Sequence, residues 1–215
     1  MNTRSEIHAP AVSVTIVLLA AGQSSRMGGR HKLLATFAGV PLVRRSALAA
    51  LGCLARSVVV VSGHRRIEIE NAVADLDLRI VHNENHLSGM ASSIACGVTV
   101  AEGDGSDGVM VMLADMPGIK QEDLDKLLLT FGARRASCIV RAVGQGKPGN
   151  PVIFPRQLYG QLKGFTGDNG ARRLIETSGI GLVDVEIGEA ARIDVDTPEQ
   201  MRRAGGTFEI GTDFR

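Results

Sequence analysis

The sequence is poor in the features that mark several common classes of protein. It has no tryptophan, and aromatic residues make up 3% of its 215 positions, which argues against a stacking surface for single-stranded nucleic acid. The 24 lysines and arginines nearly balance the 23 aspartates and glutamates, so no concentrated basic face for nucleic acid is expected. No apolar run approaches the ~20 residues that a membrane span needs. We therefore expect a cytoplasmic protein that binds neither nucleic acid nor membrane.

Cysteine is also scarce, and Cys53, Cys96 and Cys138 form no C-x-x-C pair. They offer no familiar zinc spacing, and buried free thiols are expected. The length fits one domain with a substantial core. We expect a flexible leader at 1–11, a single domain at 12–205 and a loose tail at 206–215.

Apolar, β-branched runs alternate along the chain with amphipathic segments. The runs predict strands at 12–18, 57–61, 78–81, 109–113, 137–142, 151–154, 182–187 and 192–195. The amphipathic segments predict helices at 41–54, 67–73, 91–101, 122–131, 156–163, 170–177 and 198–204. This alternation indicates an α/β fold with a mostly parallel sheet covered by helices on both faces. Residues 143–150 are expected to form a glycine-rich loop.

The loops that follow three of these strands, with Gly22, Gly63 and Asp115, should meet at the edge of the sheet where ligands bind. The first loop reads G-x-x-x-R-M-G-G-x-x-K from Gly22 to Lys32. It matches neither the phosphate-binding pattern G-x-x-x-x-G-K-[ST] nor the dinucleotide pattern G-x-G-x-x-G. What remains is a glycine-rich backbone with two cations, Arg26 and Lys32, which suits a triphosphate. The alternative is an ordinary surface loop with solvated charges.

Three carboxylates stand where a divalent cation could bind. Asp115 ends a buried strand, where a carboxylate must be solvated, paired or bound to a cation. In an extended segment, Asp194 and Asp196 point to one face. The alternatives are structural: Asp115 in a turn before Pro117, and Asp196 as the cap of the last helix, with Thr197 as a rival cap.

The segment L-A-A-G-x-S-x-R-M-G-G-x-x-K resembles the nucleotidyltransferases that act on the molybdenum cofactor. The resemblance extends from Val14 to about Ala204 and implies a three-layer, Rossmann-like nucleotidyltransferase fold. It implies that the first loop binds the nucleoside triphosphate, through Leu19, Ala20, Ala21 and Gly22. It also implies that Arg26 and Lys32 neutralise charge as the α-phosphate is attacked. The D-M-P and D-x-D-T-P-E motifs imply Mg²⁺, with Mn²⁺ as an alternative, at Asp115 and at Asp194 or Asp196.

Two further motifs of the family imply the remaining contacts. The G-M-x-S-S-[IL] segment and an upstream asparagine imply that the nucleobase lies beside Asn83, Gly89, Ser92 and Ser93, although the serines could simply cap a helix. The segments 147–152 and 166–172 imply second-substrate contacts from Asn150, Asp168 and Arg172. Asn150 stands where the family commonly has histidine, so an imidazole role there is not implied.

Taken together, the motifs imply a cytidylyltransferase that joins CTP to molybdopterin, releases pyrophosphate and has transient contact with a molybdoenzyme or its chaperone. The preference for CTP depends on Ala21, because guanylyl-transferring relatives more often have glycine there. The alternatives are a guanylyltransferase of the same cofactor and a cytidylyl- or uridylyltransferase for a sugar or polyol phosphate. A regulatory nucleotide-binding protein has less need of Asp115, and a nicotinamide-dependent oxidoreductase would need the absent G-x-G-x-x-G.

Overall fold

A seven-stranded sheet runs through the protein, whose computed structural model describes residues 12–165 and 170–208. The strand order is β5-β4-β1-β6-β8-β7-β9. In that order the strands are Arg79–His82, Ser57–Ser62, Val14–Ala20, Gly108–Leu113, Lys147–Pro155, Ile139–Gly144 and Leu182–Glu186. Strand β8 is antiparallel to β6 and β7, whereas the other neighbouring pairs are parallel. The predicted mostly parallel sheet is confirmed.

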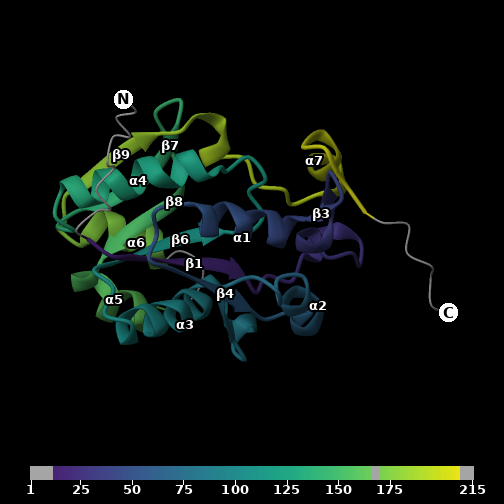
Figure 1. Ribbon diagram of the computed structural model, residues 1–215, viewed down its shortest axis with the longest axis horizontal. Helices are drawn as coiled ribbons and strands as arrows, with labels where there is room; N and C mark the ends of the chain where they lie inside the picture. The colour runs from purple at the N-terminus through teal and green to yellow at the C-terminus, as the bar shows by residue number, and fades with distance from the viewer. Residues whose placement is uncertain (1–11, 166–169, 209–215) are drawn as a thin grey trace, which may run out of the picture.

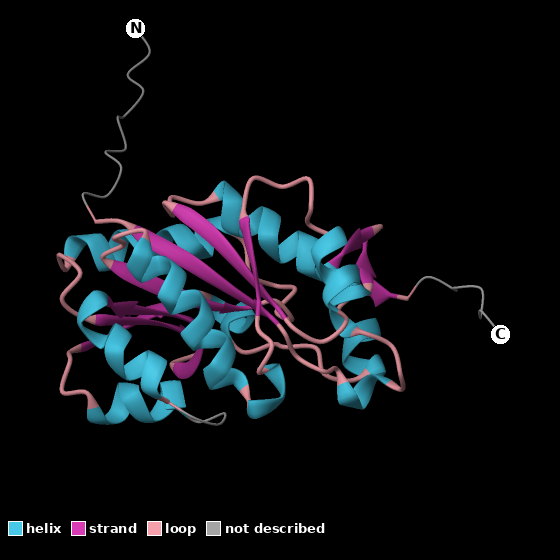
Figure 2. Cartoon of the chain, turned by 90° about the horizontal axis from the view of Figure 1, so that it is seen from below, coloured by secondary structure: helices cyan, strands magenta, loops and turns pink. Residues whose placement is uncertain are grey.

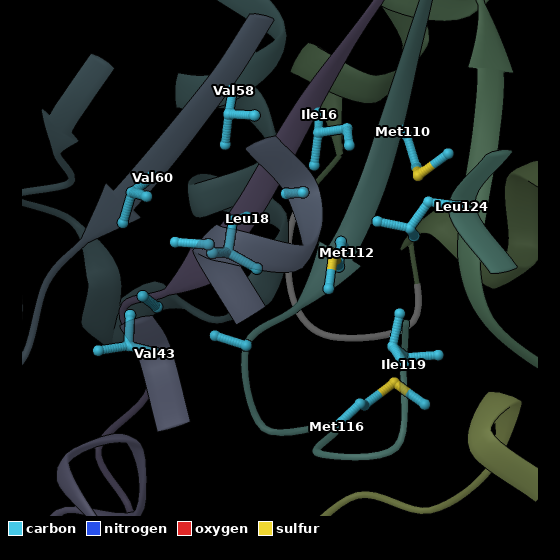
Figure 3. Close-up of a cluster of buried hydrophobic side chains, with 14 of the residues drawn as sticks. Ile16, Leu18, Val43, Val58, Val60, Met110, Met112, Met116, Ile119 and Leu124 are labelled. Atoms are coloured by element: carbon cyan, nitrogen blue, oxygen red, sulfur yellow. The ribbon is translucent and has the colours of Figure 1, made fainter. Parts of the chain in front are cut away.

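Helices cover the sheet on both faces, which confirms the α/β architecture (Figures 1 and 2). Helices α1 (Leu42–Gly52) and α4 (Gln121–Ala133) pack on one face, and α3 (Met90–Gly103), α5 (Tyr159–Gly164) and α6 (Gly170–Thr177) on the other. Strand β1 is apolar on both sides because it is covered on both: Ile16 and Leu18 join the first core, and Val17 the second. Figure 3 shows Ile16 and Leu18 among the side chains of the first core.

A small second sheet lies beside the main one and was not predicted. It has the order β10-β2-β3, formed by Gly206–Thr207, Thr36–Phe37 and Val40–Pro41. Gly206 is buried, and a Cβ there would lie 2.7 Å from Phe37 Cζ. The expectation of a loose tail from residue 206 is therefore wrong for Gly206 and Thr207, which pair with β2.

Two other expectations about local structure need correction. Residues 147–150 belong to strand β8, because the chain turns tightly at Gln145 and Gly146, where φ is 54° and 70°. Residues 192–195 do not form a strand; the N–H of Val195 donates instead to the carbonyl of Asp115 at 3.0 Å. The remaining helices are α2 (Arg66–Asn71) and α7 (Pro198–Arg203). Within the described ranges, none of the helices has the length and apolar character to cross a membrane.

Candidate active site

A cavity of about 460 Å³ opens at the carboxyl ends of β1 and β6. This is the edge at which the sequence predicted that functional loops would meet. Its charged lining comes from three separate segments: the loop after β1, the loop after β6 and the segment before α7. These segments contribute Arg26, Lys32, Asp115, Asp194 and Asp196. The fold thus brings together in one site the five charged residues that were predicted to contact the phosphates and the metal ion.

The loop after β1 is shaped by a pair of short 3₁₀ turns, Ser25–Met27 and Lys32–Leu34. Gly28 and Gly29 between them have φ of 61° and 83°, values that glycine adopts without the steric cost of a side chain. Met27 and Leu33 are buried and anchor the loop to the core. The Lys32 N–H donates to Ser24 Oγ at 3.2 Å, so the loop folds back on itself and directs its two cations to the cavity.

The two cations contact the carboxylates directly. Lys32 Nζ lies 2.5 Å from Asp115 Oδ2 and 2.7 Å from Asp196 Oδ1. Arg26 Nη2 lies 2.9 Å from Asp196 Oδ2. Burial alone would lower the pKa of Lys32, but Asp115 and Asp196 outweigh it and raise that pKa. Burial would likewise raise the pKa of Asp196, yet Lys32 and Arg26 hold it below the usual value. Lys32 is therefore a fixed cation, able to stabilise negative charge in the cavity.

The three carboxylates that line the cavity form a cluster that fits a divalent metal ion. One carboxylate oxygen each from Asp115, Asp194 and Asp196 lies within 4.8 Å of the others. Asp115 Oδ1 is buried and has no hydrogen-bond partner among the described residues, and burial raises the pKa of this carboxyl group. A buried, unpartnered oxygen in a group of hard donors is suited to Mg²⁺ or Mn²⁺.

Both aspartates of the D-x-D segment belong to this cluster. The sequence had left open whether Asp194 or Asp196 would do so. The bond from the Val195 N–H to the Asp115 carbonyl fixes the segment beside β6. The cap of α7 is Thr197, whose Oγ1 accepts from the N–H of Gln200 at 3.2 Å. Asp196 is therefore not needed as a helix cap, and its side chain can face the site.

The residues expected near the nucleotide divide into two groups. Cavity-lining members are Leu19, Ala21, Gly22, Gly89 and Ser93, whereas Ala20, Asn83 and Ser92 do not line the cavity. Asn83 is 2% exposed, and its Nδ2 donates to Ser92 Oγ at 2.8 Å and to Ser93 Oγ at 2.9 Å. The geometry makes Asn83 a positioning residue for the start of α3. Sequence reasoning missed four further lining residues: Gln23 and Met90, which stand within the recognised motifs, and His86 and Leu87, which precede one of them.

A second cavity of about 490 Å³ adjoins the first, and the two share Met90 and Leu113 as lining residues. Asn150 and Arg172, expected near the second substrate, both line it. Asp168, expected there too, lies outside the described residues. A further lining residue, Arg141, was not predicted.

Comparison with known proteins places the chain in a family. Residues 16–183 match the MobA-like NTP transferase domain, and the chain belongs to this nucleotidyltransferase family. The α/β fold, the glycine-rich loop after β1 and the carboxylate cluster agree with that membership.

Curated relatives carry several names. The chain is 30% identical to the purine catabolism protein PucB of Bacillus subtilis, covering 87% of this chain and 95% of PucB. It is 32% identical to nicotine blue oxidoreductase of Paenarthrobacter nicotinovorans, covering 88% and 95%. It is 30% identical to the molybdenum cofactor guanylyltransferase of Pseudomonas aeruginosa, covering 87% and 92%.

Solved structures share the fold. The homologue of Mycobacterium tuberculosis Rv0371c from Mycobacterium sp. strain JC1 has a TM-score of 0.77 and 29% identity, covering 88% of this chain and 93% of that one. The manganese complex of Rv0371c has a TM-score of 0.74 at 21% identity, covering 90% and 98%.

Proposed function

We propose that this protein transfers a cytidylyl group from CTP to the terminal phosphate of molybdopterin or the molybdenum cofactor. An oxygen of the acceptor phosphate forms a bond to the α-phosphorus of CTP. The bond from the α-phosphorus to the oxygen that bridges it to the β-phosphorus breaks, and pyrophosphate leaves with that oxygen. The reaction needs no covalent protein intermediate, because positioning and charge neutralisation supply most of the catalysis in such transfers.

The observation that carries this proposal is the arrangement of charges between two adjoining cavities. Arg26 and Lys32 stand beside the carboxylates of Asp115, Asp194 and Asp196 in the first cavity. A nucleoside triphosphate needs both sets, cations for its phosphates and carboxylates for its metal ion. The second cavity, which borders the first, offers room for an acceptor.

Each charged residue has a role in the proposal. Asp115, Asp194 and Asp196 would hold Mg²⁺ or Mn²⁺, which neutralises phosphate charge when bound. Arg26 and Lys32 stabilise the negative charge that develops on the α-phosphate oxygens and the leaving pyrophosphate. The short Lys32–Asp115 contact holds the ammonium group beside the carboxylates, where it would also contact a triphosphate bound in the first cavity.

The choice of CTP depends on the wall of the first cavity. Ala21 lines the cavity, and its methyl group lies beside Gly63, where an added Cβ would be 2.7 Å away. A methyl group here leaves less room for a purine than a glycine would. The Pseudomonas aeruginosa relative supports a second candidate, a guanylyltransferase of the same cofactor.

The test is pyrophosphate release with each of the four ribonucleoside triphosphates, with and without molybdopterin and Mg²⁺. The expected result is release with CTP that requires both molybdopterin and the metal ion. A preference for GTP would establish the second candidate. Release only with a sugar or polyol phosphate would overturn the acceptor, and NADH-dependent reduction without any release would overturn nucleotidyl transfer.

A further inference from the structure

The floor of the second cavity belongs to a row of residues that pair across five strands, and three of them, Val111, Val152 and Arg141, line the cavity. Val17 of β1 pairs with Val111 of β6, and Val111 pairs with Val152 of β8. Val152 in turn pairs with Arg141 of β7, which pairs with Asp184 of β9. Residues paired in register lie on the same face of a sheet. The row is therefore apolar under α3 and becomes charged at Arg141.

Arg141 is held in place by Asp184. Its Nε donates to Asp184 Oδ1 at 2.9 Å, and its Nη2 donates to Oδ2 at 3.0 Å. The Arg141 side chain is only 17% exposed. The pairing of β7 with β8 shifts register between Arg141 and Val143, an irregularity of the kind that redirects side chains beside functional sites.

The two hydrogen bonds to Asp184 leave other N–H donors of Arg141 available to a ligand. A guanidinium group has five N–H donors, and Asp184 accepts from Nε and Nη2. Among the described residues, no other side-chain hydrogen bond of Arg141 is present, and the side chain of Asn150 has none. Both residues line the second cavity. Two polar groups with unused hydrogen-bonding capacity on one cavity wall point to a ligand with oxygen acceptors.

Apart from the exposed pair Arg172 and Glu176, the rest of the cavity lining is mainly apolar and favours a flat, apolar body for that ligand. Its apolar lining includes Ile94, Val111, Leu113, Val152, Phe154 and Ile175. These side chains come from the sheet floor and from the helices α3 and α6 above it. A ring system lying between floor and helices would bring its edge to Arg141 and its other end to Leu113, which the nucleotide cavity shares.

We propose that Arg141, positioned by Asp184, is a specificity-determining residue that binds a ring carbonyl or oxyanion at the edge of a planar heterocyclic acceptor. This inference deepens the proposed function and rests on it for the acceptor's reactive phosphate. Asp184 is a positioning residue, because its carboxylate fixes the plane of the guanidinium group. A purely structural role of the pair, joining β7 to β9, would leave acceptor binding unchanged when the pair is broken.

The experiment measures the binding of pterin-6-carboxylate, a fluorescent planar heterocycle with a ring carbonyl and an oxyanion. The chain has no tryptophan, so the fluorescence of the probe is easily followed in titrations of the full-length protein. The variants are Arg141→Met, Arg141→Lys and Asp184→Asn. The matched control is Arg44→Met, since Arg44 also forms a fork with an aspartate, Asp75, but lines neither cavity.

The dissociation constant of the probe is expected to rise about 10- to 100-fold in Arg141→Met, the usual effect of losing hydrogen bonds to a charged group. Arg141→Lys should bind almost as weakly, because lysine lacks the planar fork. In Asp184→Asn the dissociation constant should rise about half as much as in Arg141→Met on a logarithmic scale. Arg44→Met should bind the probe as the wild type does. Mg²⁺ and CTP should not displace the probe.

Three results would overturn the inference: no binding to the wild type, equal binding by Arg141→Met and wild type, or displacement of the probe by CTP. If Arg141→Met does not fold, as judged by circular dichroism, Arg141→Lys and Asp184→Asn decide by the same criteria. The proposed function is tested separately by pyrophosphate release. Absence of that release with CTP, together with Arg141-dependent probe binding, would reject the proposed function and leave the assignment of Arg141 standing.

Discussion

Lys32 Nζ lies 2.5 Å from Asp115 Oδ2, although the two residues are 83 positions apart in the sequence. The contact joins the glycine-rich loop after β1 to the carboxylate at the end of β6. Only a parallel pairing of these strands brings both loops to the same edge. One ammonium group thus connects the two parts of the site that a nucleoside triphosphate needs.

Removing this ammonium group should reduce turnover. Lys32→Ala is expected to lose about 100- to 1,000-fold in kcat, the scale for removing one preorganised stabiliser of transition-state charge. The measurement is pyrophosphate release under saturating CTP, molybdopterin and Mg²⁺. Lys126→Ala is the control, because Lys126 lies on α4 and is 56% exposed. Wild-type turnover in Lys32→Ala would contradict the role assigned to this residue.

Removing the charge of Asp115 should weaken metal binding. Asp115→Asn is expected to bind Mn²⁺ at least about 10-fold more weakly, because affinity for hard cations follows the charge and number of oxygen ligands. Electron paramagnetic resonance measures free Mn²⁺ directly, so this readout does not depend on activity. Asp75→Asn, on an exposed carboxylate away from the cavity, should bind as the wild type does. Equal affinity in both variants would remove Asp115 from the metal site.

Enlarging the cavity wall at Ala21 should change the choice of nucleotide. Ala21→Gly is expected to raise the ratio of kcat/KM for GTP over that for CTP by about 10-fold or more, the scale for one methyl group in a pocket. Steady-state kinetics with both nucleotides give this ratio. Ala20→Gly is the control, because Ala20 is buried and does not line the cavity. An unchanged ratio would show that Ala21 does not select the base.

That the charged residues lie together could be predicted from the sequence, because each of them follows a buried strand or belongs to a compact motif. Arg26, Lys32 and Asp115 are of this kind. Arg141 escaped prediction because an arginine in a strand is typical of an exposed position, and its partner Asp184 lies 43 positions away. That pairing depends on β7 and β9 being neighbours, which no local pattern reveals.

Two other differences between the predictions from sequence and the structure have similar causes. Ile193 and Val195 alternate with aspartates as in a strand, but the Val195 N–H bonds to the loop carbonyl of Asp115 instead of a neighbouring strand. Asn83 resembles a base-binding residue in sequence, yet its amide is used to hold Ser92 and Ser93. In both cases a tertiary hydrogen bond decides a role that the pattern alone leaves open.

The packing of α3 on β1 should tolerate no added atom at Gly97. A Cβ there would lie 2.2 Å from Val17 Cγ1, so Gly97→Ala is expected to lower the free energy of unfolding by about 1–3 kcal/mol, the usual cost of overpacking. Gly103→Ala, in the same helix, is the matched control because nothing lies within 4 Å of its added Cβ. Urea denaturation measures both variants. A neutral or stabilising Gly97→Ala would mean that α3 can shift away from the sheet.

The stability of the protein should depend on pH through His31, which is 2% exposed. Its Nε2 donates to the Gly22 carbonyl at 3.1 Å, because a carbonyl can only accept. Its Nδ1 is buried without a partner among the described residues, so protonation there would bury an unpaired donor. Burial accordingly lowers the pKa of His31 from 6.5 to about 4.

The sign of the pH effect follows from this lowered pKa. Between pH 6.5 and 4 the unfolded chain binds a proton at His31 that the folded chain does not, so stability falls as the pH falls, by at most about 1.4 kcal/mol per pH unit. Urea denaturation from pH 7.5 to 4.5 measures this slope. In His31→Gln and His31→Asn the slope should be shallower, whatever their stability at pH 7.5. Identical slopes in wild type and both variants would show that His31 takes up its proton equally in the folded and unfolded chain.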